Sequence, residues 1–138
     1  MLKNTGITIA LAMLSMVGAL GIDAYLPSFP AIIQDFQTTP LAVQQTLSIY
    51  VGAMAITTLF AGTLSDSFGR RFTVIVSLLL FTAGSALAIF AKDIQVLLVA
   101  CALQGVAAGF GSVLSRTIVQ DRFQGAEAQR VMALIMMV

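Results

Sequence analysis

Histidine and tryptophan are absent from this chain of 138 residues, and its single cysteine is Cys101. Without histidine, no imidazole can act as a general base or as a metal ligand. A single cysteine excludes both an internal disulfide and a thiolate metal cluster. The chain also contains no G-x-x-x-x-G-K-[ST] phosphate-binding loop. We therefore expect no metal site, no cofactor and no enzyme activity.

Charge is scarce as well, because only 9% of the residues are charged whereas 59% are hydrophobic. Soluble domains are typically about 25% charged and about 45–50% apolar. A soluble fold of this size could not bury so much apolar surface. The formal net charge of +1 provides no broad basic surface for a nucleic acid. The composition therefore predicts an integral membrane protein whose surroundings are the lipid bilayer, without a nucleic-acid partner.

The few charges divide the chain into apolar stretches of membrane-spanning length. A spanning helix needs about 20 predominantly apolar residues, and these stretches lack the alternating polarity of barrel strands. Helices are then the expected structure, because each backbone polar group in lipid must be paired. The sequence predicts an all-α protein with four transmembrane helices and the start of a fifth, at about residues 6–26, 45–64, 72–91, 94–115 and 131–138.

The segments between these stretches are expected to be loops. Residues 27–44 contain the three prolines of the chain, which suit a loop, and residues 116–130 are polar. The run at 131–138 is too short to cross a bilayer, so we expect this chain to be the N-terminal part of a longer protein. Six of the seven Lys and Arg residues fall on one side of the predicted helices. The positive-inside rule therefore predicts a cytoplasmic N-terminus.

Three polar residues inside the spans are candidates for binding a proton or a substrate. Asp23 is the only ionisable residue within an apolar run, and such a carboxylate usually faces a cavity or a partner. It could exchange protons or attract a cation, or it could simply cap the outer end of its helix near Pro27. Gln104 lies on a polar face of the fourth span, and Tyr50 lies in the second. Each could contact a substrate or form a hydrogen bond between helices.

Small residues in the fourth span predict close helix packing. Gly105 and Gly109 form a G-x-x-x-G pair, which lets two helix backbones approach in lipid. Such pairs are common in helical membrane proteins. The pattern therefore indicates a packed bundle and leaves its activity open.

The short segment between the second and third spans carries the most specific motif. Gly69 permits a tight turn between antiparallel helices. Asp66 and the arginines at 70 and 71 can form charge-assisted hydrogen bonds. Asp121, on the same predicted side, is a reachable partner for Arg70. Such an ion cluster could hold one conformation and break in another, although an ordinary positively charged loop would have a similar composition.

This segment resembles the signature loop of the major facilitator superfamily, G-x-L-[AS]-D-R-x-G-R-R. The matching positions are Gly62, Leu64, Asp66, Gly69, Arg70 and Arg71. Residues 23–27 and 103–105 resemble segments of the first and fourth helices in the Bcr/CflA drug-efflux branch, and residues 116–121 resemble the segment that follows. Ser67 differs from the Arg or Lys usual in the signature. Cys101 stands where many members carry an Arg linked to proton coupling.

The resemblance implies a twelve-helix transporter made of two six-helix halves that move substrate by alternating access. This chain would hold part of the N-terminal half. The implied activity is proton-coupled efflux of drugs or small amphipathic metabolites across the inner membrane. Its partners would be the substrate, protons, the lipid bilayer and the remaining helices. A dedicated metabolite carrier, a membrane scaffold without transport and an inactive fragment are the alternatives. The residues implied for a conformational latch are Gly62, Asp66, Gly69, Arg70, Arg71, Arg116 and Asp121.

Overall fold

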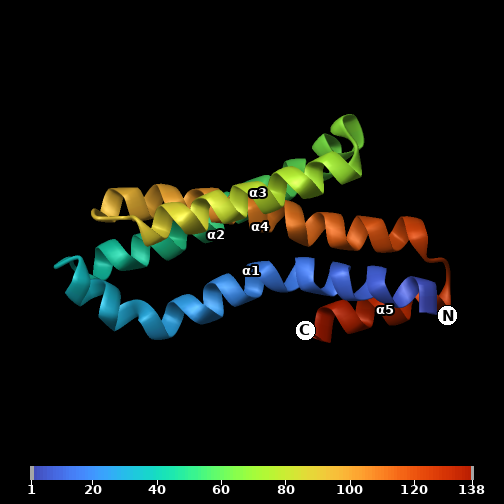
Figure 1. Cartoon of the computed structure of the whole chain (residues 1–138), viewed down its shortest axis with the longest axis horizontal. Coiled ribbons are helices and arrows are strands. Elements are labelled where there is room, and N and C mark those ends of the chain that lie inside the picture. Colours follow the sequence, from blue (N-terminus) through green and yellow to red (C-terminus); the bar gives the residue numbers. More distant parts are fainter. Residues whose placement is uncertain (1, 138) are drawn as a thin grey trace.

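The computed structural model describes residues 2–137, which form five α-helices (Figure 1). The first four are long and apolar enough to cross a membrane, which confirms the prediction of an all-α membrane protein. The predicted end of the fifth helix, Val138, lies outside the described residues. The helices are α1 (Leu2–Asp35), α2 (Pro40–Phe68), α3 (Arg70–Ile89), α4 (Ile94–Arg122) and α5 (Ala126–Met137).

The prediction of a loop over residues 27–44 is wrong for most of that segment. Helix α1 continues through Pro27 and Pro30, and its C-terminal half bends visibly (Figure 1). A proline removes one backbone donor and kinks a helix without necessarily ending it. Within an apolar span, a loop would leave many more backbone groups unpaired than a bent helix does. The connection to α2 is therefore confined to residues 36–39.

Two of the other connections are shorter than predicted, whereas the connection between α3 and α4 is longer and covers residues 90–93 rather than 92–93. The polar segment 116–130 is mostly helical, since α4 runs to Arg122 and α5 begins at Ala126 rather than near residue 131. Only Gly69 separates α2 from α3. At the start of α2, the Thr39 hydroxyl accepts a hydrogen bond from the backbone N–H of Ala42 at 3.3 Å. The polar residues at these helix ends did not predict loops correctly, because a helix can continue into water when its polar side chains are solvated.

Helix α4 lies at the centre of the bundle and contacts all four other helices. It is also the most buried of the four membrane-length helices. Its glycines explain the close approach. A Cβ atom on Gly109 would lie 2.8 Å from the Met54 carbonyl oxygen and 2.8 Å from the Thr57 Cβ of α2. A Cβ atom on Gly105 would collide with the Tyr50 carbonyl. The G-x-x-x-G pair is thus the contact surface between α4 and α2.

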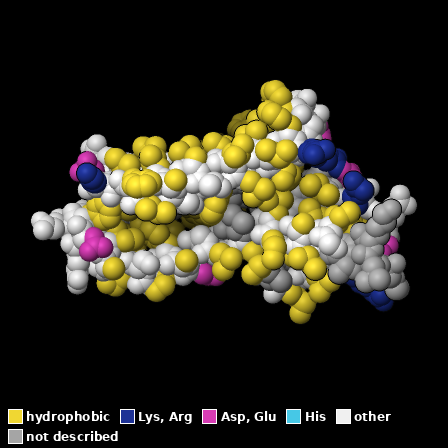
Figure 2. Space-filling view, in the orientation of Figure 1, with side chains coloured by type: hydrophobic (Ala, Val, Ile, Leu, Met, Phe, Trp, Pro, Cys, Tyr) yellow, Lys and Arg dark blue, Asp and Glu magenta, His cyan; other side chains and the backbone are white. Residues whose placement is uncertain are grey.

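The outer surface of the bundle is apolar along most of its length. Large side chains such as Leu59, Leu79 and Ile89 are each more than 60% exposed. Figure 2 shows hydrophobic side chains covering the long side, with most of the charged ones near its two ends. This distribution is the reverse of a soluble protein and fits a bundle that faces lipid tails.

Candidate functional site

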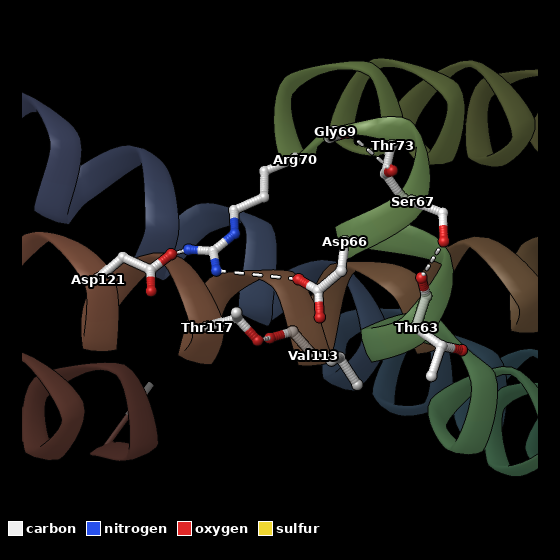
Figure 3. A network of polar contacts seen from close by, with 9 residues as sticks. All are labelled: Thr63, Asp66, Ser67, Gly69, Arg70, Thr73, Val113, Thr117 and Asp121. Atoms are coloured by element: carbon white, nitrogen blue, oxygen red, sulfur yellow. Dashed lines mark hydrogen bonds and ion pairs between the residues drawn. The ribbon is translucent and has the colours of Figure 1, made fainter.

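Arg70 joins three helices at one end of the bundle (Figure 3). From the first turn of α3, its guanidinium lies 4.0 Å from a carboxylate oxygen of Asp66 in α2. The same guanidinium forms an ion pair with Asp121 near the end of α4. The Arg70 side chain is 34% exposed, against 44% for Asp121 and 71% for Asp66. Water screens the attraction between Arg70 and the more exposed Asp66 more strongly than the attraction between Arg70 and Asp121. Asp121 is therefore the dominant partner of Arg70.

Local backbone geometry places Arg70 in this position. Gly69 adopts φ 87° and ψ 139°, a conformation that side chains disfavour. Its N–H donates to the Ser65 carbonyl at 3.0 Å, and its own carbonyl accepts from the Thr73 hydroxyl at 3.0 Å. Helix α2 therefore ends and helix α3 begins on either side of this single residue. Arg70 then follows directly, on the side that faces α4.

Other residues of the predicted latch lie outside this ion pair network. Gly62 lies within α2, and a Cβ atom there would meet nothing within 4 Å. Arg71 is exposed beside the network. Arg116 lies one and a half turns before Asp121 and lines a separate cavity. Among the described residues, neither of these two arginines takes part in an ion pair.

That cavity lies between α1, α2, α4 and α5 and has a volume of about 410 Å³. Its wall includes the side chains of Met54, Met132 and Met136, which come from two different helices. Methionine is flexible and polarisable, so it adapts to ligands of different shape. Among the described residues of the lining, Arg116 alone is charged. These methionines could not be predicted from the sequence, because no periodic pattern connects residues on separate helices.

Two of the predicted polar residues form hydrogen bonds between helices. The Tyr50 hydroxyl is buried and donates to the Gly18 carbonyl of α1 at 3.0 Å. The Gln104 side-chain amide donates to the Ser85 hydroxyl of α3 at 2.9 Å. Neither residue lines the cavity next to Arg116. In this structure both connect helices, which was one of the two roles that the sequence left open.

A third connection between helices was missed in the sequence. The Tyr25 hydroxyl of α1 forms a hydrogen bond with the Thr46 hydroxyl of α2. Thr46 is fully buried and also donates to the Val43 carbonyl at 2.6 Å. Only the pairing of α1 with α2 brings Tyr25 and Thr46 together, so neither residue is distinctive on its own.

Asp23 is exposed on α1 and does not line the cavity. No hydrogen bond or ion pair of its carboxylate is found within residues 2–137. The suggestion that it caps the outer end of its helix is wrong, because α1 continues to Asp35. With Pro27 four residues later, the Asp23 carbonyl also lacks its usual helical donor. Asp23 therefore presents acceptor oxygens from both its side chain and its backbone.

The membrane-length helices, the arginine network and the interhelical cavity together define a polytopic helical membrane protein. Residues 11–138 match the Major Facilitator Superfamily. The chain therefore belongs to this family, as the resemblance of its signature loop predicted. No solved structure was found to match the chain.

Several curated relatives are similar over nearly the whole chain. An uncharacterized MFS-type transporter, YdgK of Bacillus subtilis, is 37% identical over 99% of this chain. Multidrug resistance protein D of Escherichia coli is 27% identical over 98% of it. A bicyclomycin resistance protein homolog of Haemophilus influenzae is 35% identical over 99% of it. The chain spans 34% of the length of each of these relatives.

Proposed function

We propose that the full-length protein is a proton-coupled efflux transporter for drugs or small amphipathic metabolites. It is a carrier rather than an enzyme, and it works by alternating access with the two halves rocking about a central cavity. It lies in the inner (plasma) membrane with its N-terminus in the cytoplasm. The clustering of Lys and Arg at one end of the bundle supports this orientation.

The observation that carries the proposal is the position of Arg70 between Asp66 and Asp121. The contact joins α2, α3 and α4 through partly exposed charges, which can separate at a small cost in free energy because water solvates the separated groups. Ion pairs of this kind suit a latch, because they stabilise one arrangement of the helix ends and can break when the helices adopt another arrangement. We infer that it closes the cytoplasmic side during transport.

The cavity beside Arg116 supports transport of amphipathic compounds. Its methionines offer an adaptable apolar wall, while the hydroxyls of Ser15 and Ser112 offer hydrogen-bond acceptors. Binding sites for small molecules commonly combine such a wall with a few polar groups. In the whole transporter we assign this surface to one side of the substrate path. The names of two relatives, multidrug resistance protein D and the bicyclomycin resistance protein homolog, agree with this substrate class.

Asp23 is the proposed proton site. It is an ionisable residue within the membrane-length segment of α1, and such residues commonly belong to proton or ion pathways. Its carboxylate takes part in no ion pair among the described residues. The Arg found at the Cys101 position in many family members is missing here, so the coupling depends on Asp23 or on residues beyond this chain.

Flux measurements in proteoliposomes test the proposal. We expect the full-length protein to export fluorescent amphipathic compounds when an imposed proton gradient drives protons in the opposite direction, and to stop when a protonophore removes the gradient. A deletion strain should become drug-sensitive. Loss of uptake of one metabolite without drug sensitivity would instead indicate a dedicated metabolite carrier. Absence of any flux would indicate a scaffold or an inactive fragment.

A further inference from the structure

A buried hydroxyl without a hydrogen bond lies one residue before Asp66. Ser65 of α2 is 1% exposed, and within the described residues its side-chain oxygen has no hydrogen-bond partner. The hydroxyls two residues before and after it on α2 do have partners. Thr63 donates to the Phe60 carbonyl at 2.9 Å, and Ser67 donates to the Thr63 carbonyl at 2.9 Å. Ser65 therefore differs from its neighbours on the same helix.

Burial alone does not explain the unpaired hydroxyl. Ser77 of α3 is 2% exposed and donates to the Val74 carbonyl at 2.8 Å. Ser115 of α4 is fully buried and donates to the Ser112 carbonyl at 3.0 Å. A buried serine in this bundle can thus satisfy its hydroxyl with a carbonyl of its own helix. A hydroxyl that has neither such a bond nor water raises the free energy of the packed state.

The described helices themselves enclose the Ser65 oxygen. Helices beyond this chain therefore cannot reach it while α2 keeps this packing. Ser65 lies in the last turn of α2, next to charges that belong at the aqueous end of a membrane span. When this turn separates from its neighbours, water can bind the hydroxyl and satisfy it.

We propose, on the basis of the latch in the proposed function, that Ser65 limits the stability of the closed latch. The ion pairs of Arg70 with Asp66 and Asp121 stabilise the packed helix ends, whereas the unpaired Ser65 hydroxyl destabilises the same arrangement. In the open arrangement the separated charges and the hydroxyl are all solvated. The hydroxyl thereby keeps the closed and open states close in free energy, as repeated switching between them requires. Removing it should favour the closed state about tenfold.

Hydrogen–deuterium exchange of the full-length protein in detergent tests this effect without requiring transport. Ser65→Ala removes the unpaired hydroxyl and leaves a small apolar side chain in its place. We expect exchange of the backbone amides in residues 62–73 to slow about tenfold, because these amides exchange from the open arrangement. Residues 90–96, at the opposite end of the bundle, should exchange at the same rate as in the wild type.

Ser77→Ala is the matched control, because it removes a buried hydroxyl that is paired. Exchange in residues 62–73 should not slow in this variant. Unchanged or faster exchange in Ser65→Ala would overturn the proposal, because the hydroxyl would then be neutral or favourable in the closed state. Equal slowing in both variants would also overturn it, since the effect would not depend on the missing hydrogen bond.

Export measurements separate this proposal from the proposed function. Ser65→Ala should slow drug efflux, and adding Asp121→Asn, which weakens the closed latch, should restore part of the rate. Efflux equal to that of the wild type, together with slowed exchange, would overturn the role of Ser65 in the transport cycle. If the wild type exports nothing, the proposed function fails, while slowed exchange in Ser65→Ala still supports the effect of its hydroxyl on the packed helix ends.

Discussion

Gly105 of α4 lies directly against the backbone carbonyl of Tyr50 in α2, without room for a side chain between the two helices. The obstacle is backbone rather than a flexible side chain, so α2 and α4 would have to move apart to accept even a methyl group. Tyr50 at the same level bonds α1 through its hydroxyl. A shift here would therefore disturb three helices together.

Gly105→Ala should lower the free energy of unfolding in detergent by about 1–3 kcal/mol, the usual cost of overpacking a close contact. Thermal unfolding followed by circular dichroism measures the effect. Gly52→Ala is the matched control, because a Cβ atom at Gly52 of α2 would meet nothing within 4 Å. Its stability should be unchanged or slightly higher. Equal stability of the two variants would contradict the close packing of α2 and α4.

Asp121→Asn should slow export by the full-length protein more than Asp66→Asn does. Asp121 is the less exposed of the two partners of Arg70. Exposed ion pairs contribute at most about 1 kcal/mol, which corresponds to about a fivefold change in a conformational equilibrium. The initial rate of drug efflux from proteoliposomes measures the effect at equal protein content.

Two controls accompany this latch experiment. Asp93→Asn removes an exposed carboxylate at the opposite end of the bundle and should leave export unchanged. Combining Arg70→Asp with Asp121→Arg reverses the pair and should restore part of the rate lost in either single variant. Unchanged export by Asp121→Asn would remove the assignment of this ion pair as a latch.

Gln104→Leu and Ser85→Ala should each destabilise the protein by about 0.6–1.7 kcal/mol, the range for hydrogen bonds between membrane helices. The double variant should lose little more than the larger single loss, because both remove the same bond between α3 and α4. The KM for drug efflux is the second readout. A KM change in Gln104→Leu that Ser85→Ala does not share would show that Gln104 also contacts substrate.

Asp23→Asn should abolish most proton-driven export, while Asp23→Glu should retain a substantial part of it. Asparagine has a similar shape but cannot exchange a proton, whereas glutamate can. Proton uptake coupled to drug efflux is measured in proteoliposomes with an internal pH indicator. Asp35→Asn, at the end of the same helix, is the control and should be neutral. Equal coupled export by Asp23→Asn and Asp23→Glu would leave Asp23 without a role in coupling.

Several features of the site could be predicted from the residues themselves. The pairing of Arg70 with Asp121 could be anticipated, because both follow spans that end on the same predicted side of the membrane. The role of the G-x-x-x-G pair could also be anticipated, since only small residues permit such contact. The role of Gln104 could not be predicted in this way. Its face of α4 could have lined a cavity or packed against another helix, and only the structure shows that Ser85 of α3 lies next to it.

The sequence by itself determined the class of this protein, because uncharged runs of spanning length and scarce charge leave the bilayer as the only favourable environment. It also determined the number of membrane-length helices. Only the tertiary structure decided that α1 passes through Pro27 and Pro30, and that Arg116 faces a cavity whose wall includes three methionines. The physical reason is that α4 contacts all four other helices. The periodicity of such a helix cannot tell which face meets which partner, since that depends on how all the helices pack around it.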